Sequence, residues 1–219
     1  MASYTWFFIQ ETKGSPAKAD PVKQEEWIGS YNALMDSLPA RDVVEFGDGV
    51  HPTISTKLSY GWIRTGKNKL IETTGSRTRM NLMGSINLKS MELSIAEFKT
   101  IDSEAMKQHF LLLRSKYKTV NKIHLILDQG SYNTSEKTKK FAEEQGIILH
   151  YLPTYSPNLN PFERLWKVMN EYCRKNKYFA TAKEFRETIM HFFNDTWPKI
   201  ACYMSSRIND NFQILKSTI

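Results

Sequence analysis

The sequence predicts an α/β protein in which a mixed sheet is flanked by helices. Residues 43–99 contain short β-rich runs separated by glycines and polar pairs, a pattern typical of antiparallel strands. Residues 122–152 then follow the order strand, helix, strand, which indicates a parallel crossover. Helical patterns precede and follow these segments, so strands of both directions should share one sheet between helices.

The start of the chain, residues 1–19, is expected to be a short apolar segment followed by a connector. Small, polar and turn-forming residues fill positions 12–18. Asp20 and Pro21 then open a helix, and Pro39 ends it. With 219 residues and 41% hydrophobic content, the remaining chain can bury one substantial core. We therefore assign residues 20–219 to a single domain.

The middle of the chain is expected to form strands, then a helix and the crossover. A helix should begin near Ser103, and the spacing from Asn133 to Glu136 predicts a capping box for the crossover helix, which Gly146 ends. The expected strands cover residues 43–46, 57–64, 79–88, 91–98, 122–127 and 147–152.

The last third is expected to be helical. Asn160 and Pro161 open a helix that runs to roughly Lys175, after a proline-rich loop. A final helix should open at Thr181 with Glu184 at capping-box distance, before Pro198 and an irregular tail.

Three acidic residues are the candidate site. Asp48 and Asp128 each close an apolar run, and Glu163 follows Asp128 after 34 intervening residues, inside the helix that Asn160 opens. Each has an ordinary alternative, because Asp favours turns and Glu163 stands at capping-box distance from Asn160. Together they are the ligand set that two divalent cations need beside a phosphodiester.

Three stretches resemble the catalytic core of mariner-type DDE transposases, above all the bacterial insertion-sequence branch. They are residues 48–53, residues 126–130 and the loop and helix start 152–167, with its Tyr-Ser-Pro and Asn-Pro-x-Glu motifs. The resemblance runs from about residue 18 to 212. It implies a ribonuclease H-like fold in which Asp48, Asp128 and Glu163 are the catalytic, metal-binding triad.

Two features depart from the family pattern. Gln129 stands where the family typically has Asn after the second Asp, which affects fine positioning. Full-length relatives also carry helix-turn-helix DNA-binding modules ahead of the core, and we expect none in this sequence.

The resemblance implies two Mg²⁺ (or Mn²⁺) ions held by the triad and double-stranded DNA as partner, both transposon ends and target, with a homodimer as the active form. The expected activity is strand cleavage and strand transfer at transposon ends. Two alternatives stay open: a ribonuclease H-like nuclease without strand transfer, and a domesticated module that binds DNA without catalysis.

Basic residues near the acids are candidate DNA contacts. Lys167 lies four residues after Glu163 on the same helical face, and Arg164 is adjacent, although a solvated helix surface explains both equally well. A second group lies around the early strands and could line a DNA channel. Its members are Lys57, Arg64, Lys67, Lys69, Arg77 and Arg79.

Composition agrees with a polyanionic partner but does not prove one. The formal charge is +7 and the pI is about 9.3. Cys173 and Cys202 form no metal or disulfide motif and are expected to be reduced structural thiols. No apolar stretch is long enough to span a membrane, so a bacterial cytoplasmic protein, nucleoid-associated when bound to DNA, is expected.

The remaining histidines and aromatic residues are expected to be structural. His51 should order the loop beside Pro52 rather than assist Asp48, and His124 and His150 alternate within strands. The four aromatic residues expected to anchor the core or loops, rather than to stack on bases, are Trp62, Tyr155, Trp166 and Trp197.

Overall fold

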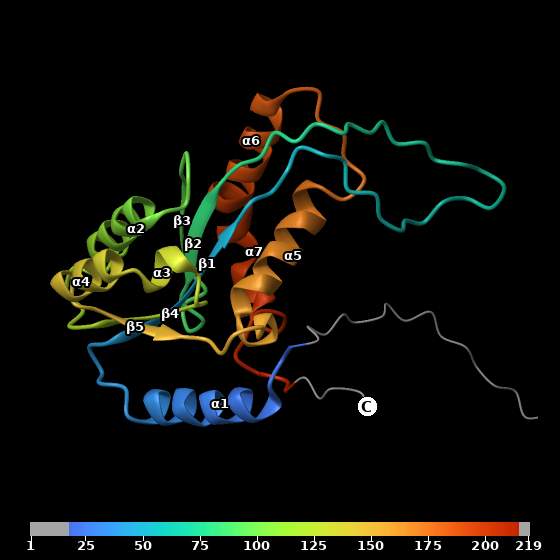
Figure 1. Cartoon of the computed structure of the whole chain (residues 1–219). Helices are drawn as coiled ribbons and strands as arrows, with labels where there is room; N and C mark the ends of the chain where they lie inside the picture. Colours follow the sequence, from blue (N-terminus) through green and yellow to red (C-terminus); the bar gives the residue numbers. More distant parts are fainter. Residues whose placement is uncertain (1–17, 215–219) are drawn as a thin grey trace, which may run out of the picture.

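The computed structural model describes residues 18–214 and has three layers, with a central sheet between two groups of helices (Figure 1). The mixed α/β architecture predicted from the sequence is therefore confirmed. The predicted N-terminal segment, residues 1–19, lies almost wholly outside the described residues.

The sheet has five strands in the order β3-β2-β1-β4-β5. The pairs β1–β2 and β2–β3 are antiparallel, whereas β1–β4 and β4–β5 are parallel. The parallel half is the predicted crossover. The strands are β1 (Val43–Val50), β2 (Leu82–Ile86), β3 (Leu93–Glu97), β4 (Ile123–Leu127) and β5 (Ile147–Tyr151).

Helices cover both faces of the sheet, and in Figure 1 α2 and α4 lie on the opposite side from α5, α6 and α7. The helices are α1 (Pro21–Asp36), α2 (Ser103–Lys116), α3 (Ser131–Thr134), α4 (Glu136–Glu144), α5 (Pro161–Cys173), α6 (Ala182–His191) and α7 (Trp197–Met204). A 3₁₀ turn, η1 (Pro157–Leu159), precedes α5, and a π-helical segment, η2 (Phe192–Thr196), joins α6 to α7.

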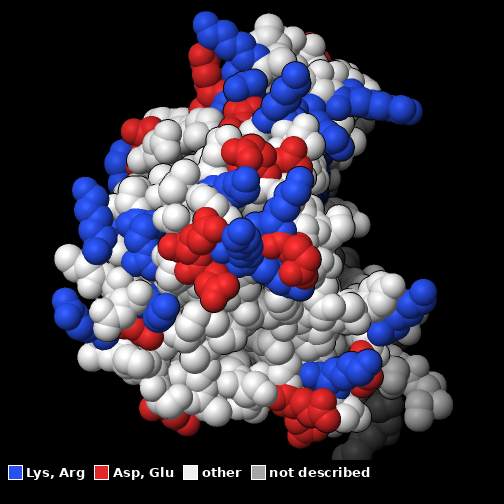
Figure 2. All heavy atoms as spheres, turned by 60° about the vertical axis from the view of Figure 1, so that its left-hand side comes forward, with Lys and Arg blue, Asp and Glu red and all other residues white. Residues whose placement is uncertain are grey.

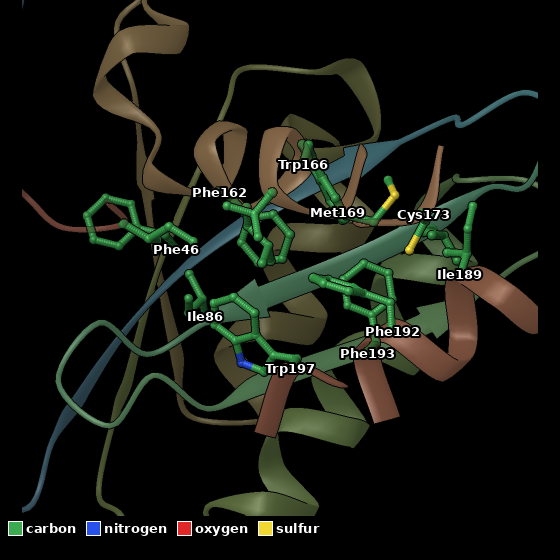
Figure 3. Close-up of a cluster of buried hydrophobic side chains, with 14 of the residues drawn as sticks. Phe46, Ile86, Phe162, Trp166, Met169, Cys173, Ile189, Phe192, Phe193 and Trp197 are labelled. Carbon is green, nitrogen blue, oxygen red and sulfur yellow. The ribbon is translucent and has the colours of Figure 1, made fainter. Parts of the chain in front are cut away.

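Alternating side chains of the strands build two separate cores. Leu125 and Leu127 of β4 pack with α2 and α4, whereas Ile126 joins Phe46 of β1 in the larger core with α5, α6 and α7. Figure 3 shows part of this larger core, in which aromatic rings dominate. Successive residues of one strand therefore face different helical layers, as the two-residue period of a strand requires.

The strand predicted over residues 57–64 is wrong. Residues 51–81 leave the sheet between β1 and β2 as a long excursion, which projects to the right in Figure 1. The β-type pairing described for it consists of two isolated bridges outside the sheet, Thr53 to Arg79 within the excursion and Lys57 to Lys175 just after α5. The apolar side chains that suggested a buried strand are exposed, and Trp62 is fully so.

Two predicted helix boundaries are also wrong. Ser135 rather than Asn133 caps α4, because its hydroxyl accepts from the Thr138 N–H at 3.2 Å. Pro198 does not end the helical region but lies in the first turn of α7, where a missing N–H breaks no hydrogen bond. The irregular tail predicted from there is instead helix as far as Met204.

Helix α5 packs unusually close to the sheet. A Cβ atom on Gly84 of β2 would lie 2.7 Å from the Phe162 ring, so only glycine permits this approach. The Asn160 side chain caps α5 by accepting from Phe162 N–H, while its Nδ2 donates to Gly47 O of β1 at 3.2 Å. These contacts fix the start of α5 against β1 and β2.

The opposite face of β1 carries a buried acid, Glu45, whose carboxylate interacts with α2 and the residue after it. Tyr117 donates a hydrogen bond to Glu45 Oε1, and Lys116 Nζ lies 3.3 Å from the same oxygen. Burial still raises the pKa of Glu45, although these partners oppose the rise. A buried acid on this strand can thus be compensated from within the chain.

His109 of α2 should make the fold sensitive to acid. It is fully buried, neither ring nitrogen has a hydrogen-bond partner among the described residues, and burial lowers its pKa to about 4. Because the unfolded residue takes up a proton below about pH 6.5, stability should fall between there and pH 4. Between pH 7 and pH 4.5, protonation of His109 on unfolding should lower the free energy of unfolding by about 2–3 kcal/mol. His109→Met should lack this part of the loss, as measured by urea unfolding at the two pH values.

The exposed His191 is the matched control, since its replacement by Met should leave the acid sensitivity of the fold unchanged. Equal losses of stability in the wild type and the His109→Met protein would contradict the prediction.

Candidate active site

Asp48 of β1 and Asp128, the residue directly after β4, lie at the same end of two neighbouring parallel strands. The last pair between β1 and β4 is Phe46 with Ile126. Asp48 and Asp128 each follow two residues after this pair, so they lie at the same level. Adjacent strands are about 5 Å apart, which brings the two carboxylates to the same end of the sheet. The first strand is longer than the predicted 43–46, because β1 continues to Val50, and Asp48 therefore lies within it rather than after it.

Glu163 reaches the same place from the first turn of α5. All three acids line one pocket of about 390 Å³, together with the loop that follows β5. The other lining residues are Gln129, Gly130, Leu152, Pro153, Thr154, Tyr155, Ser156, Pro157 and Asn160. The structure thus gathers the three acids that the sequence singled out.

The capping-box alternative for Glu163 accounts for only half of the geometry. Asn160 does cap α5 through its side chain, but the Asn160 N–H donates to Pro157 O at 3.1 Å. The Glu163 carboxylate is therefore not needed at that N–H, and it faces the pocket.

The three acids repel one another. Burial raises the pKa of Asp48 to about 8, and the charges of Glu163 and Asp128 add to the rise. The pKa of Glu163 is also raised by burial and by Asp128, whereas Lys167 lowers it. Such mutual strain is typical of carboxylates arranged for function rather than for stability.

Hydrogen bonds hold the Asp128 carboxylate from one side. Its Oδ1 accepts from Asn133 Nδ2 at 2.6 Å and from Gly130 N–H at 3.1 Å. Tyr151 Oη donates to Asn133 O at 2.9 Å, which anchors α3 to the end of β5. This role of Asn133 was not predicted from the sequence, because its spacing to Glu136 matches a capping box.

Gln129, the departure from the family pattern, has a clear structural role. Its Nε2 donates to Leu152 O at 2.9 Å, which ties the residue after Asp128 to the start of the pocket loop.

Asp48 is held by α5. Its Oδ2 accepts from the Trp166 indole N–H at 2.8 Å, and this hydrogen bond lowers the pKa of Asp48 against the larger effect of burial. No Lys or Arg of the described chain forms an ion pair with Asp48.

The loop after β5 contains a strained residue. Tyr155 has a φ of 58°, which a bulky residue rarely adopts, and its side chain is exposed at the pocket. Lys18 Nζ lies 5.7 Å from the centre of its ring. Tyr155 is therefore not a core anchor, and its role as a loop anchor stays a prediction. The prediction for Trp62 is wrong, because this fully exposed side chain of the excursion anchors neither core nor loop.

The remaining structural predictions mostly hold. Trp166 and Trp197 are buried core residues. His51 Nδ1 lies 2.8 Å from Asn81 Oδ1 in the adjoining loops, and His124 Nδ1 lies 2.9 Å from His150 Nε2 across β4 and β5.

Both cysteines, Cys173 and Cys202, are free, but only Cys173 is buried. Within residues 18–214, no helix is both long and apolar enough to cross a membrane.

The predicted DNA-contact residues occupy two environments. Arg164 points away from the pocket, since its guanidinium donates to Asn209 O at 2.6 Å. Lys167 is exposed and close enough to Glu163 to lower its pKa. The residues of the early basic group, Lys57, Arg64, Lys67, Lys69, Arg77 and Arg79, are all exposed on or beside the excursion.

Positive charge does not dominate every surface. Figure 2 shows the face formed mainly by α2 and α4, where basic and acidic side chains alternate. Ion pairs such as Lys107–Glu104 and Lys139–Glu136 occur there. This face is therefore a weaker candidate for following a DNA backbone than the excursion.

The pocket has the chemistry of a divalent-cation site without a compact cluster of ligands. Its three carboxylates supply the oxygen ligands that Mg²⁺ and Mn²⁺ prefer, and a cation would offset their repulsion. Among the described residues, no three His, Cys, Asp or Glu side chains converge closely enough to ligate a single ion as they stand. Repulsion between the three negative carboxylates favours this separation. As oxygen ligands, carboxylates fit Mg²⁺ and Mn²⁺.

A family model matches more than half of the chain. The family model described as "DDE superfamily endonuclease" matches residues 43–186. A relative from Shigella sonnei, "Insertion element IS630 uncharacterized 39 kDa protein", is 24% identical over 180 residues, which cover 82% of this chain and 52% of the relative. The chain therefore spans about half the length of that protein.

Structure comparison gives the same fold at low sequence identity. The Mos1 transposase paired-end complex with left transposon end has a TM-score of 0.64 at 12% identity, over 93% of this chain and 68% of that one. The Mos1 mariner paired-end complex with Mn gives 0.63 at 13%, over 94% and 68%. The catalytic domain of Mos1 mariner transposase gives 0.50 at 13%, over 84% and 91%. The predicted ribonuclease H-like fold is confirmed.

Replacing Asp48 with Asn should stabilise the fold when divalent cations are absent. The folded state holds the pKa of Asp48 at about 8, whereas an unfolded aspartate titrates near 4. The wild type therefore loses stability as the pH rises through that window, and the neutral amide avoids the loss. In EDTA at pH 8 we expect a gain of at least ~1 kcal/mol, or roughly 2–4 °C in thermal unfolding.

The gain should shrink towards zero at pH 4. Asp36→Asn, on the exposed end of α1, is the control for a change of charge alone. A wild-type midpoint equal to that of Asp48→Asn at pH 8 would refute the idea that the pocket acids are strained.

Proposed function

Because the chain belongs to the DDE superfamily endonucleases, we propose that it is the catalytic domain of a transposase that cuts and joins DNA at the ends of a mobile element. The observation that carries the proposal is that Asp48 of β1, Asp128 just after β4 and Glu163 of α5 all line one pocket. The name of the IS630 relative and the transposon end in the Mos1 complex support this choice of substrate.

Asp48, Asp128 and Glu163 would hold two divalent cations, Mg²⁺ or Mn²⁺. The Mos1 complex described with Mn supports this for a protein of the same fold. Bound cations would ease deprotonation of the attacking hydroxyl and offset charge on the departing oxygen. The proposed domain covers residues 20–219.

The reaction would use one pocket twice. In cleavage, water attacks phosphorus and the bond to the 3′ oxygen breaks, which leaves a 3′-hydroxyl and a 5′-phosphate. In strand transfer, that 3′-hydroxyl attacks a target phosphate and displaces the target's own 3′ oxygen. Asn133 and Gly130 keep the Asp128 carboxylate in one orientation through both steps.

DNA would approach along the exposed basic residues. Lys167 stands beside Glu163 and can contact a phosphate next to the reacting one. Lys57, Arg64, Arg77 and Arg79 would follow the backbone farther out, whereas Arg164 is engaged with Asn209 and serves the fold. We further propose that two copies of the chain act together on paired transposon ends, in the bacterial cytoplasm. The Mos1 structure described as a paired-end complex supports the pairing.

Asp128→Asn should abolish cation-dependent nicking while the fold stays intact. The substrate is a supercoiled plasmid carrying the genomic sequences that flank the coding region, incubated with Mg²⁺ or Mn²⁺. Loss of a ligand carboxylate should lower the nicking rate on the order of a thousandfold. The exposed Asp36→Asn should retain full activity.

Retained nicking by the purified Asp128→Asn protein would remove the triad from the mechanism. Adding pre-cleaved ends with free 3′-hydroxyls separates the remaining functions. Joined products indicate a transposase, nicking without joining indicates a nuclease, and binding without either indicates a non-catalytic DNA-binding module.

The basic excursion should contribute salt-sensitive affinity for DNA. Arg64→Gln combined with Arg77→Gln removes two exposed charges from it. If each contacts one phosphate, the slope of log affinity against log salt should become shallower by about 2. Binding of a labelled duplex, followed by fluorescence anisotropy across a salt series, measures the slope.

Lys137→Gln combined with Lys140→Gln makes the same charge change on α4, within the face of mixed charge. This control should leave the slope unchanged. Equal effects of the two double variants would show that only net charge matters and would remove the excursion from the DNA path.

A further inference from the structure

Resting on the proposed function, we propose that Trp166 is a positioning residue for the cation site. Its indole N–H fixes one oxygen of the Asp48 carboxylate from the core side and so determines how Asp48 presents itself to divalent cations. Trp166 would touch neither DNA nor metal; it would act through Asp48.

The donor is rigidly held. The Trp166 side chain is only 4% exposed, and its ring packs edge-on against Phe162 at 4.6 Å and Phe193 at 6.0 Å between centroids. Figure 3 shows Trp166 within this aromatic cluster. A ring locked on two sides places its N–H at one point, 2.8 Å from Asp48 Oδ2.

The hydrogen bond approaches Asp48 from outside the pocket. Asp48 lines the pocket whereas Trp166 does not. The core thus engages Oδ2 of a carboxylate that also lines the pocket, and the Gly49 backbone N–H is a second neutral donor to the same carboxylate. Indole nitrogen is a donor only, so it cannot compete with Asp48 as a ligand.

The donor that Trp166 offers to Asp48 carries no charge, and this affects how strongly the site attracts cations. Lys or Arg at this position would orient Asp48 equally well, but its positive charge would neutralise the acid and repel incoming cations. A neutral N–H orients the carboxylate and leaves its negative charge available. Burying this donor within the core also keeps water from replacing it.

The same hydrogen bond links the two elements that carry the acids. Trp166 and Glu163 are three residues apart on one face of α5, so fixing Trp166 against Asp48 also fixes Glu163 relative to β1. The bond from Asn160 Nδ2 to Gly47 O is a second tie between the same elements. Trp166 therefore sets both the orientation of one ligand and the spacing of two.

The test is Mn²⁺ affinity, measured without DNA from the free-ion signal in electron paramagnetic resonance. Trp166→Phe keeps an aromatic ring in the core but removes the donor. Trp197→Phe is the matched control, because Trp197 is 2% exposed in the same core and its N–H donates to Met91 O at 2.9 Å, away from the pocket. Figure 3 shows both indoles.

We expect Trp166→Phe to weaken Mn²⁺ binding about tenfold, the usual effect of losing a partner that orients a ligand. Trp197→Phe should stay within about twofold of the wild type. Nicking by Trp166→Phe should recover as Mn²⁺ is raised, since the ligands themselves remain.

Unchanged Mn²⁺ affinity in Trp166→Phe would overturn the proposal. An equal loss in Trp197→Phe would also overturn it, because a loosened core would then explain both. If Trp166→Phe does not fold, β-(3-benzothienyl)alanine at position 166 keeps the ring size and replaces the N–H with sulfur, and the same two outcomes apply. A wild-type protein that binds no Mn²⁺ at millimolar concentration would instead refute the proposed cation site itself.

Discussion

The close packing of α5 against β1 and β2 is the contact on which the candidate site depends. Gly84 lets the Phe162 ring approach the sheet, Asn160 joins the helix start to the backbone of β1, and Trp166 reaches Asp48 one turn farther along. Each interaction comes from a different side chain, yet all fix the same helix. Glu163 projects from that helix, so the position of the third acid follows from how well α5 is seated.

The site conflicts electrostatically with the fold that carries it. Three carboxylates share one pocket, and burial and mutual repulsion raise the pKa of Asp48 to about 8. A purely structural protein would gain stability by replacing one of them, because isolated buried charge is unfavourable. The surrounding aromatic core offsets this strain. It also supplies, through Trp166, a donor that holds Asp48 without neutralising it.

Local patterns predicted the sheet and the triad because strand period, the spacing from Asp128 to Glu163 and the loop motif are all encoded in neighbouring residues. The sequence did not reveal that residues 57–64 leave the sheet, since an alternating pattern looks the same whether or not a partner strand exists. Nor could it show that Asn133 binds Asp128 rather than capping α4. Such roles depend on which distant elements meet, and spacing along the chain does not record that.

Glu45 and Asp48 allow a direct comparison, because they lie three residues apart on the same strand and face opposite layers. Glu45 is compensated from within the chain by the Lys116 ammonium and by a hydrogen bond from Tyr117. Asp48 receives the neutral Trp166 N–H and stands beside two further acids instead. Within residues 18–214, the fold therefore supplies a cation to a buried acid of β1 on the structural face, and no ion pair of these residues includes Asp48. On the pocket face the same strand leaves the negative charge uncompensated, which is the arrangement that a site for external divalent cations requires.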